Sequence, residues 1–375
     1  MKIFHLINSY SRAGAEMLVA QLLADMPQDW ERHVCAIGSS LDKKDSEMLH
    51  FLDSAGVISH QLYKKASADR LKAIFRLRKI IKKVSPDILH THCESPDLYG
   101  RLASVGLPVR RFRTIHVHNP WSSNPVIGYL LEKTLSPLPV TSIACSPGME
   151  QTFDQLGIPK HYRLTIANGI KLPPLLDATI EKQRWLRYLD LPSDTILVGT
   201  VGRVARQKGH DLLIKALPGL LKKHPNLVVV VAGAVNTEPE YYKQVKKMLQ
   251  VAQLGSILRF VGSLSQIPSF MAACDALVFP SRWEGLSLAV LEALGSGTPT
   301  LVSNCQPHSS LLSGPYSRLL FKTESVDDLK RSLSWVLSAE IKEIPDTRAL
   351  VKKEYSFKRM LQGYLDCYLM KQGNE

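Results

Sequence analysis

The chain has 375 residues, enough for two domains of ordinary size. Hydrophobic residues make up 45% of it and charged residues 22%, proportions that exclude a disordered, collagenous or coiled-coil protein. The 47 Lys and Arg outnumber the 34 Asp and Glu by 13, which suits polyanionic partners such as nucleic acid, anionic lipid or phosphorylated substrates. The six cysteines form no C-x-x-C pair, so we expect neither a disulfide framework nor a structural zinc site. This use of cysteine fits a reducing compartment, so we expect a cytoplasmic location.

Short β-branched runs alternate with longer helical patterns along the chain. Strands are predicted in the first half over Lys2–Asn8, His33–Gly38, Ile88–His92, Arg113–His118 and Ser142–Cys145. Strands are predicted in the second half over Ile196–Val201, Leu227–Ala232, Leu258–Val261, Ala276–Phe279 and Thr300–Val302. Apolar residues at three-to-four spacing predict helices such as Glu16–Met26, Ala68–Val84, His210–Lys223 and Glu240–Gln253. This alternation predicts an α/β protein with two doubly wound parallel sheets of five strands each.

The boundary between the halves lies in Ala167–Pro174, a turn followed by a Pro-Pro break. We therefore predict a first domain over residues 1–168, a second over 169–352, and a C-terminal helix within 353–375. Ligands of open α/β sheets bind beyond the carboxyl ends of the strands. The expected site is therefore a cleft between the two domains.

The stretch Pro280–Pro299 follows a predicted strand and opens a helix at about Leu286. Free N–H groups and the positive end of the dipole at a helix start favour an anion, most naturally a phosphate. Glu284 lies in the loop before this helix and Glu292 about two turns into it, with side chains roughly 80° apart around the axis. We expect the two carboxylates to accept hydrogen bonds from different parts of one ligand, Glu292 from a ribose and Glu284 from a sugar. The ordinary alternative is one dipole-compensating charge and one solvated glutamate.

Two further loops follow strands. In Val201–Asp211, Arg203 and Lys208 lie in a glycine-bounded loop where two cations could clamp a diphosphate, the alternative being a basic surface loop. Gly14 connects the first predicted strand to the first helix, where it would permit close approach to a ligand. A plain strand-to-helix turn is the alternative there.

Two H-x-H runs, His90-Thr91-His92 and His116-Val117-His118, each end a predicted strand. Residues two apart on a strand face the same way, so each pair could chelate a metal. No Cys or carboxylate stands at ligand spacing, so no metal is expected. We expect polar side chains at the rim of the cleft, one of them touching a substrate hydroxyl.

Together these stretches resemble the retaining glycosyltransferases of family 4, which have the GT-B fold. The family's two glutamates eight residues apart read here Pro280-Ser281…Glu284-Gly285…Glu292-Ala293…Gly297-Thr298-Pro299. Its G-R-x-x-x-x-K-G element reads Gly202-Arg203…Lys208-Gly209, its interdomain N-G reads Asn168-Gly169, and its strand-end histidine lies in Thr114-Ile115-His116. The likeness runs in order from Ile3 to about Phe321.

The resemblance implies two Rossmann-like domains facing each other across a cleft, with the C-terminal helix crossing back to the first. The second domain would bind a nucleotide-sugar donor without a metal or other cofactor. The residues implied to contact that donor are Arg203 and Lys208 at the diphosphate, the N–H groups of Gly285, Leu286, Ser287 and Leu288 beside it, Glu292 at the ribose, Glu284 at the sugar, and Gly14 near the phosphates. His116 would orient donor sugar or acceptor, and the implied transfer retains the anomeric configuration.

Departures from the family pattern limit which residue roles and substrates the resemblance implies for this chain. Val117 stands where Asp is common, which leaves His116 and His118 as alternatives, with the T-x-H frame favouring His116. Residues Asn304–His308 replace the usual Gly-Gly-x-x-Glu segment, so the donor sugar stays open. The His116–Asn119 run resembles bacterial exopolysaccharide and capsule transferases, which implies a glycan or polyprenyl-diphosphate-linked acceptor.

Two other functions remain as alternatives. A nucleotide-sugar 2-epimerase shares the GT-B fold, but it needs an acid/base set and lacks the glutamate frame. A basic nucleic-acid-binding protein has only the net charge in its favour, since no helix-turn-helix, RNA-recognition or zinc signature is present, and we expect no nucleic-acid partner.

One segment concentrates the positive charge. Lys64–Lys83 contains nine basic residues and one acidic residue, Asp69, around an apolar stripe of Ile74, Leu77, Ile81 and Val84 that should pack on the first domain. This segment is either a solvated basic face or a docking face for anionic lipid. The second interpretation predicts a cytoplasmic protein that is peripheral on the inner face of the cell membrane.

Overall fold

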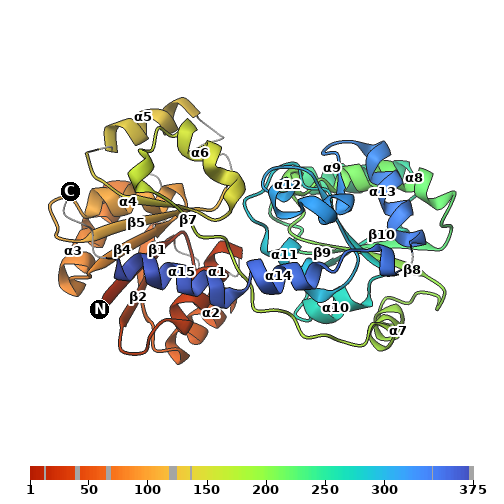
Figure 1. Cartoon of the computed structure of the whole chain (residues 1–375), viewed down its shortest axis with the longest axis horizontal. Helices are drawn as coiled ribbons and strands as arrows, with labels where there is room; N and C mark the ends of the chain where they lie inside the picture. Colours follow the sequence, from red (N-terminus) through yellow and green to blue (C-terminus); the bar gives the residue numbers. More distant parts are fainter. Residues whose placement is uncertain are drawn as a thin grey trace. The chain divides into compact units, whose positions relative to one another are not determined.

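A computed structural model of the chain describes residues 1–11, 14–38, 43–64, 69–117, 125–135, 137–339 and 341–370. The chain divides into two compact units, here called unit 1 and unit 2 (Figure 1). Unit 1 comprises Met1–Ala167 together with Lys358–Glu375, and unit 2 comprises Asn168–Phe357. Among the helices of the described ranges, none has the length and apolar character that crossing a bilayer requires.

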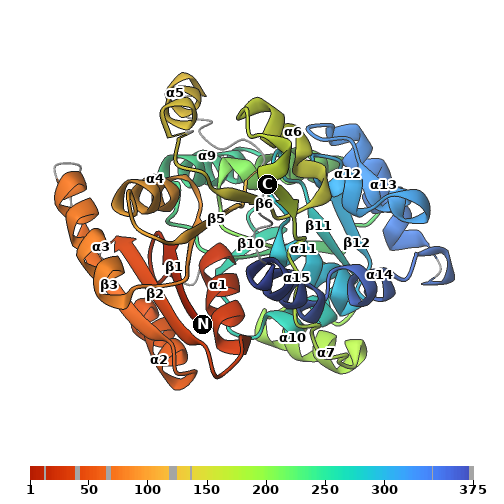
Figure 2. The ribbon, with the colours of Figure 1, turned by 60° about the vertical axis from the view of Figure 1, so that its left-hand side comes forward.

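Unit 1 contains a seven-stranded parallel sheet in the order β3-β2-β1-β4-β5-β6-β7. Its strands are β1 (Lys2–Ile7), β2 (Glu31–Gly38), β3 (Ile58–Lys64), β4 (Ile88–His92), β5 (Arg110–Ile115), β6 (Thr141–Ala144) and β7 (Arg163–Thr165). Its helices are α1 (Gly14–Asp25), α2 (Lys43–Ser54), α3 (Arg70–Val84), α4 (Glu94–Ala103), α5 (Pro125–Leu135), α6 (Glu150–Gln155) and α15 (Phe357–Leu369). Helix α3 packs against α4 and β3 at one side of the sheet (Figure 2).

Unit 2 contains a six-stranded parallel sheet in the order β10-β9-β8-β11-β12-β13. Its strands are β8 (Ile196–Val201), β9 (Leu227–Ala232), β10 (Leu258–Gly262), β11 (Ala276–Phe279), β12 (Thr300–Ser303) and β13 (Leu320–Phe321). Its helices are α7 (Ala178–Tyr188), α8 (His210–Leu221), α9 (Pro239–Val251), α10 (Ile267–Ala273), α11 (Leu288–Ser296), α12 (His308–Leu311), α13 (Val326–Ser338) and α14 (Thr347–Glu354). All of β9 is buried, as a strand covered on both faces should be.

The predicted pair of doubly wound α/β units is confirmed, whereas the prediction of five strands in each was wrong. The missed strands are β3, β7 and β13, and each lies at an edge of its sheet. Strand β3 has three consecutive polar residues, Ser59, His60 and Gln61, in its middle. Strands β7 and β13 span three and two residues, so none of the three strands forms a continuous apolar run. Edge strands need less apolar sequence because one side of each is not covered by another strand.

Helix α15 belongs to unit 1, although it follows the whole of unit 2 in the sequence. Arg110 of β5 donates from Nη1 to the carbonyl of Tyr368 at 2.7 Å and from Nη2 to that of Met370 at 2.9 Å. A guanidinium at the C-terminal end of a helix satisfies carbonyls that lack helical partners and complements the helix dipole. The C-terminal helix predicted within 353–375 is α15. Tyr355 and Ser356 separate it from α14, and Ser356 forms an isolated β-bridge with Ile170.

Candidate functional site

Glu284 is the most tightly held of the predicted site residues. It lies in the loop between β11 and α11, with 5% of its surface exposed. Lys208 Nζ is 2.6 Å from Oε1, to which Ser281 Oγ also donates at 2.8 Å. Gln207 Nε2 donates to Oε2 at 3.1 Å. The structure therefore brings two predicted residues, 76 positions apart, into one buried ion pair.

The backbone allows these two loops to meet at Gly209, which has a left-handed φ of +67°. A Cβ atom there would lie 2.0 Å from the carbonyl oxygen of Pro280, closer than any side chain can approach. Directly beside this contact, the amide of Arg282 donates to the carbonyl of Gln207 at 2.8 Å. A glycine is thus required for Lys208 to reach Glu284.

A second ion pair joins the same two loops. Arg282 donates from Nη1 and Nη2 to the two carboxylate oxygens of Asp211, each at 2.9 Å. The hydroxyl of Tyr241 donates to Asp211 at 2.6 Å. Burial alone would raise the pKa of Asp211, but these hydrogen bonds hold the pKa below its ordinary value. The bidentate pair fixes the positions from which Lys208 and Glu284 project.

Arg203 lies apart from this cluster. It follows β8, is exposed, and forms no ion pair with any residue of the described ranges. Lys208 is therefore paired with Glu284 in the structure, whereas Arg203 is not. An exposed guanidinium without an acidic partner remains available to an anion.

Helix α11 begins two residues later than the sequence suggested. Its first residue is Leu288, and Gly285, Leu286 and Ser287 precede it. The carbonyl of Leu286 accepts a hydrogen bond from Asn168 Nδ2 at 3.3 Å, and Ser287 has extended backbone angles. Ser287 makes no side-chain cap, so the first amides of α11 receive no hydrogen bond from it.

Glu292 is the fifth residue of α11, just over one turn into the helix, so the predicted depth of two turns was wrong. Burial raises the pKa of Glu292 to about 7. No group in the described part of the chain donates a hydrogen bond to its carboxyl. Glu292 is therefore a carboxyl with a raised pKa that forms no part of the Lys208–Glu284 pair, as expected for a residue that contacts a different part of a ligand.

The segment Asn304–His308, which departs from the family pattern, follows β12. Its Cys305 and His308 are buried, with His308 Nδ1 3.3 Å from the sulfur of Cys305 and 3.1 Å from the carbonyl oxygen of Ser303. Ser303 Oγ donates to the carbonyl of Ser281. The segment is thus connected through Ser303 to the loop that carries Glu284.

Gly14 and His116 belong to unit 1. Gly14 is the exposed first residue of α1, while its predicted neighbours Arg12 and Ala13 lie outside the described residues. Strand β5 ends at Ile115, so His116 follows the strand, and the expectation that the strand continues to His118 was wrong as far as the chain is described. His118 itself lies outside the described residues. Burial lowers the pKa of His116 to about 4, so its imidazole is neutral at physiological pH.

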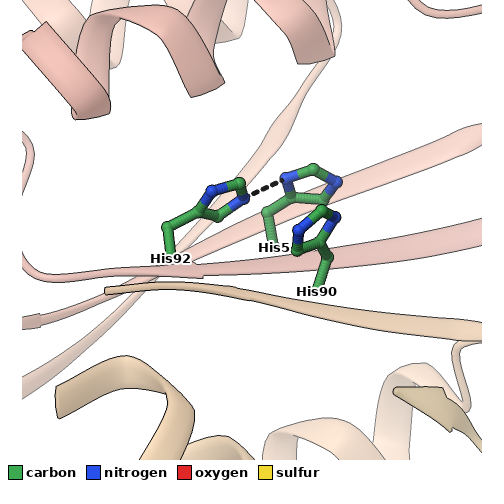
Figure 3. A group of neighbouring side chains, drawn as sticks. All are labelled: His5, His90 and His92. Atoms are coloured by element: carbon green, nitrogen blue, oxygen red, sulfur yellow. Dashed lines mark hydrogen bonds between the residues drawn. The ribbon is translucent and has the colours of Figure 1, made fainter. Parts of the chain in front are cut away.

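The first H-x-H run is not at a rim, as the sequence suggested, but in the core of unit 1. His90 and His92 share one face of β4 and lie beside His5 of β1, and all three side chains are buried (Figure 3). One nitrogen from each histidine lies within 4.8 Å of the others, which makes them the group of the described residues best placed to hold a metal. His5 was not predicted as part of this group, because a histidine within an apolar strand has no partner at short spacing.

Two family profiles match the chain over most of its length. The profile described as "Glycosyltransferase Family 4" matches residues 12–172, and the one described as "Glycosyl transferases group 1" matches residues 181–355. The two matches fall on either side of the division between unit 1 and unit 2.

Similar proteins come from bacterial polysaccharide synthesis. An Escherichia coli protein named UDP-Gal:alpha-D-GlcNAc-diphosphoundecaprenol alpha-1,3-galactosyltransferase is 26% identical over 73% of this chain and 72% of its own length. The capsular polysaccharide biosynthesis glycosyltransferase CapH of Staphylococcus aureus is 23% identical over 83% of each chain. The crystal structure of HepE from Anabaena, in complex with UDP and glucose, superposes with a TM-score of 0.84 at 18% identity and covers 98% of this chain and 99% of HepE.

Proposed function

Because the chain belongs to the family 4 glycosyltransferases, we propose that it moves a sugar from a nucleoside-diphosphate donor to a glycan or polyprenyl-diphosphate-linked acceptor, with retention of anomeric configuration and without a metal. The relatives named above support bacterial surface polysaccharide as the product class. They are described as transferases, which favours transfer over 2-epimerisation. The observation that carries the proposal is the Lys208–Glu284 pair, whose glutamate lies four residues before α11.

The proposed donor site lies in unit 2 around that pair. The HepE structure contains UDP and glucose, and the likeness of fold supports a nucleotide ligand for this chain as well. Lys208 has three N–H donors, so it can keep its hydrogen bond to Glu284 while it donates to a diphosphate. Together with Arg203 and the first amides of α11, it would stabilise the charge that develops on the leaving nucleoside diphosphate. Glu284 would accept from the donor sugar and Glu292 from the ribose.

The same groups support transfer without a metal. A divalent cation in such a reaction would neutralise the diphosphate. Here the exposed Arg203, the partly buried Lys208 and a helix N-terminus supply positive charge instead. In unit 1, Gly14 would permit close approach to the phosphates, and His116 would hydrogen-bond the donor sugar or the acceptor.

A nucleotide-release assay tests this proposal. The full chain is incubated with a panel of UDP- and GDP-sugars, with and without an undecaprenyl-diphosphate-linked sugar, in buffer containing EDTA or magnesium. We expect one donor to release its nucleoside diphosphate faster when acceptor is present, at rates that agree within about twofold between the two buffers. Isomerisation of a donor without nucleotide release would indicate an epimerase. Loss of activity in EDTA, restored by magnesium, would contradict the metal-independent mechanism.

We further propose that unit 1 docks on an anionic membrane through α3. The helix exposes Leu71 and Phe75, which are 70% and 66% accessible and one helical turn apart. The same helix exposes six basic residues, namely Arg70, Lys72, Arg76, Lys79, Lys82 and Lys83. Its buried stripe of Ala73, Leu77, Ile81 and Val84 packs on the core, so Leu71 and Phe75 are not needed for folding. Each basic residue near an anionic surface contributes about 1 kcal/mol, and the two apolar side chains would enter the interface.

Co-sedimentation with liposomes tests this docking. We expect binding to vesicles that contain anionic lipid, little binding to zwitterionic vesicles, and weaker binding as salt is raised. Replacing Leu71 and Phe75 by glutamate should abolish it. The matched control is Val251→Glu, at an equally exposed apolar residue of α9 in unit 2, which is 77% accessible. Binding that is indifferent to lipid charge, or lost equally in the control, would refute the proposal.

A further inference from the structure

A continuous series of hydrogen bonds crosses the core of unit 1 and ends at His116. We call it the histidine relay; its members in order are Tyr364, Thr114, His90, Tyr368, His5, His92 and His116. The hydroxyl oxygens of Tyr364 and Thr114 are 3.0 Å apart, and the hydroxyl of Thr114 is 2.8 Å from His90 Nε2. The hydroxyl of Tyr368 is 3.3 Å from His5 Nε2, and His5 Nδ1 is 3.0 Å from His92 Nε2. His92 Nδ1 is 3.1 Å from His116 Nε2. The remaining link joins His90 Nδ1 to the hydroxyl of Tyr368. Every member is buried except His116, which is partly exposed.

The orientation of the rings argues against a metal among the three core histidines. A metal must lie in the plane of each imidazole that binds it, about 2.1 Å from the nitrogen. The rings of His90 and His92 are stacked, with centroids 4.4 Å apart and planes inclined by 15°, and those of His5 and His92 are stacked at 26°. Stacked rings direct their nitrogen lone pairs side by side rather than toward one point. Each of these nitrogens, moreover, already has a hydrogen-bond partner (Figure 3 shows the one between His92 and His5).

The relay can be protonated in two ways. A neutral imidazole has one donor and one acceptor nitrogen, so each histidine passes on the direction of the hydrogen bond that it receives. The hydroxyls of Thr114 and Tyr368 do the same when each uses its own O–H as a donor within the relay. If Tyr364 donates to Thr114, then His90, His5 and His92 each carry their proton on Nδ1, and His116 Nε2 accepts. In the opposite direction, each of these histidines carries its proton on Nε2.

The Tyr364 end decides between the two directions. In the described part of the chain, the hydroxyl of Tyr364 has one hydrogen-bond partner, Thr114, and the side chain is 1% exposed. In the second direction Tyr364 accepts from Thr114, and its own buried O–H has no acceptor there. An unpaired buried donor disfavours that arrangement by at least about tenfold. In the first direction, the O–H or N–H of each of the six buried members has an acceptor within the relay.

We propose that the histidine relay fixes the tautomer of His116, so that Nε2 accepts from His92 and Nδ1 carries the proton as a hydrogen-bond donor at the exposed end. Thr114, His90, Tyr368, His5 and His92 are positioning residues in this arrangement. Burial keeps the core histidines neutral, since it lowers the pKa of His5 to about 3 and those of His90 and His92 well below the ordinary value. The consequence for sugar transfer rests on the proposed function: His116 would donate to, rather than accept from, a substrate oxygen.

Two substitutions at Thr114 distinguish an effect on the relay from an effect on folding. Thr114→Val keeps the shape and removes the hydroxyl that connects Tyr364 to His90. Thr114→Ser keeps the hydroxyl and is the matched control. NMR spectra of the full chain with ¹⁵N-labelled histidine report directly which ring nitrogen is protonated, and His116→Gln assigns the signal of His116.

We expect His116 in the wild type and in Thr114→Ser to be at least about nine-tenths in the Nδ1–H form. In Thr114→Val, the two forms should be present in comparable amounts, because His90 Nε2 then lacks a partner in either direction and the bias from Tyr364 no longer reaches it. Turnover of the donor identified by nucleotide release should fall in Thr114→Val in proportion to the lost Nδ1–H form, and it should keep the wild-type value in Thr114→Ser.

An Nε2–H form of His116 in the wild type, an unchanged spectrum in Thr114→Val, or equal behaviour of the two variants would overturn the relay. Titration with zinc alone that saturates at one ion per chain and shifts the signals of His5, His90 and His92 would replace it by a metal site. Unchanged turnover in Thr114→Val with an altered tautomer would refute its role in transfer. If no donor is turned over at all, the proposed function fails, whereas the spectra still decide on the relay.

Discussion

Replacing Lys208 by alanine is expected to lower sugar transfer by about 10²–10³-fold, the effect of removing one preorganised donor from developing negative charge. Lys208 is the cation closest to Glu284, at 2.6 Å, and only 14% of its side chain is exposed. The loss should appear mainly in turnover rather than in donor affinity, because the charge on the diphosphate grows as the bond to the sugar breaks. Initial rates of nucleotide release over a range of donor concentrations measure both quantities.

The same substitution should lower stability, since it leaves the buried Glu284 carboxylate without its cation, at a cost of about 3 kcal/mol. Adding Glu284→Gln to Lys208→Ala removes that charge and should restore the free energy of unfolding without restoring transfer. Lys222→Ala, at an exposed lysine that follows α8, is the matched control and should change neither quantity. If the double variant regained activity together with stability, Lys208 would have a structural role alone.

Glu292→Gln is expected to make the protein more stable at pH 8 and yet inactive. The pKa of Glu292 is raised to about 7 by burial, above its value of 4.5 in the unfolded chain. Between pH 4.5 and pH 7, the Glu292 carboxyl is therefore mainly protonated in the folded state and mainly ionised in the unfolded state. The wild type loses stability as the pH rises through this range. A neutral glutamine avoids this loss, which amounts to about 3 kcal/mol above pH 7 and vanishes below pH 4.5.

Urea denaturation of the wild type and the variant at pH 4.5 and pH 8 measures the stability difference. Binding of UDP gives a second readout, because ribose hydroxyls that donate to Glu292 favour its carboxylate form. UDP should therefore bind more tightly to the wild type as the pH rises through 7, with release of a proton, whereas Glu292→Gln should bind weakly and without this dependence. Equal UDP affinity in the two proteins across this range would show that Glu292 does not contact the ribose.

The parts of the fold that the sequence predicted are those with continuous apolar signals. Ile196–Val201, Leu227–Ala232 and Ala276–Phe279 match the observed strands residue for residue, because central parallel strands are buried on both faces. The short edge strands β7 and β13 lack that signal. The start of α11 was misplaced because a hydrogen bond from Asn168, far away in the sequence, holds the carbonyl of Leu286.

For the site, the sequence indicated which loops carry the chemistry, but not how their side chains pair. Lys208 and Glu284 were assigned to different parts of a ligand, whereas the structure joins them directly. The clamp between Arg282 and Asp211 was missed, although both residues lie in the quoted stretches, because a pairing between distant loops has no local pattern. The histidine relay was missed for the same reason: His5, Tyr364 and Tyr368 come from the two ends of the chain.

The mass of the acceptor after the reaction decides whether the chain transfers a sugar. An undecaprenyl-diphosphate-linked sugar is incubated with the full chain and the donor selected by nucleotide release, and the lipid product is examined by mass spectrometry and anomeric NMR. We expect one added sugar for each nucleotide released, with the anomeric configuration of the donor, and no detectable addition with Lys208→Ala in the same time. Donor consumption that leaves the mass of every acceptor unchanged, or full addition by Lys208→Ala, would contradict this expectation.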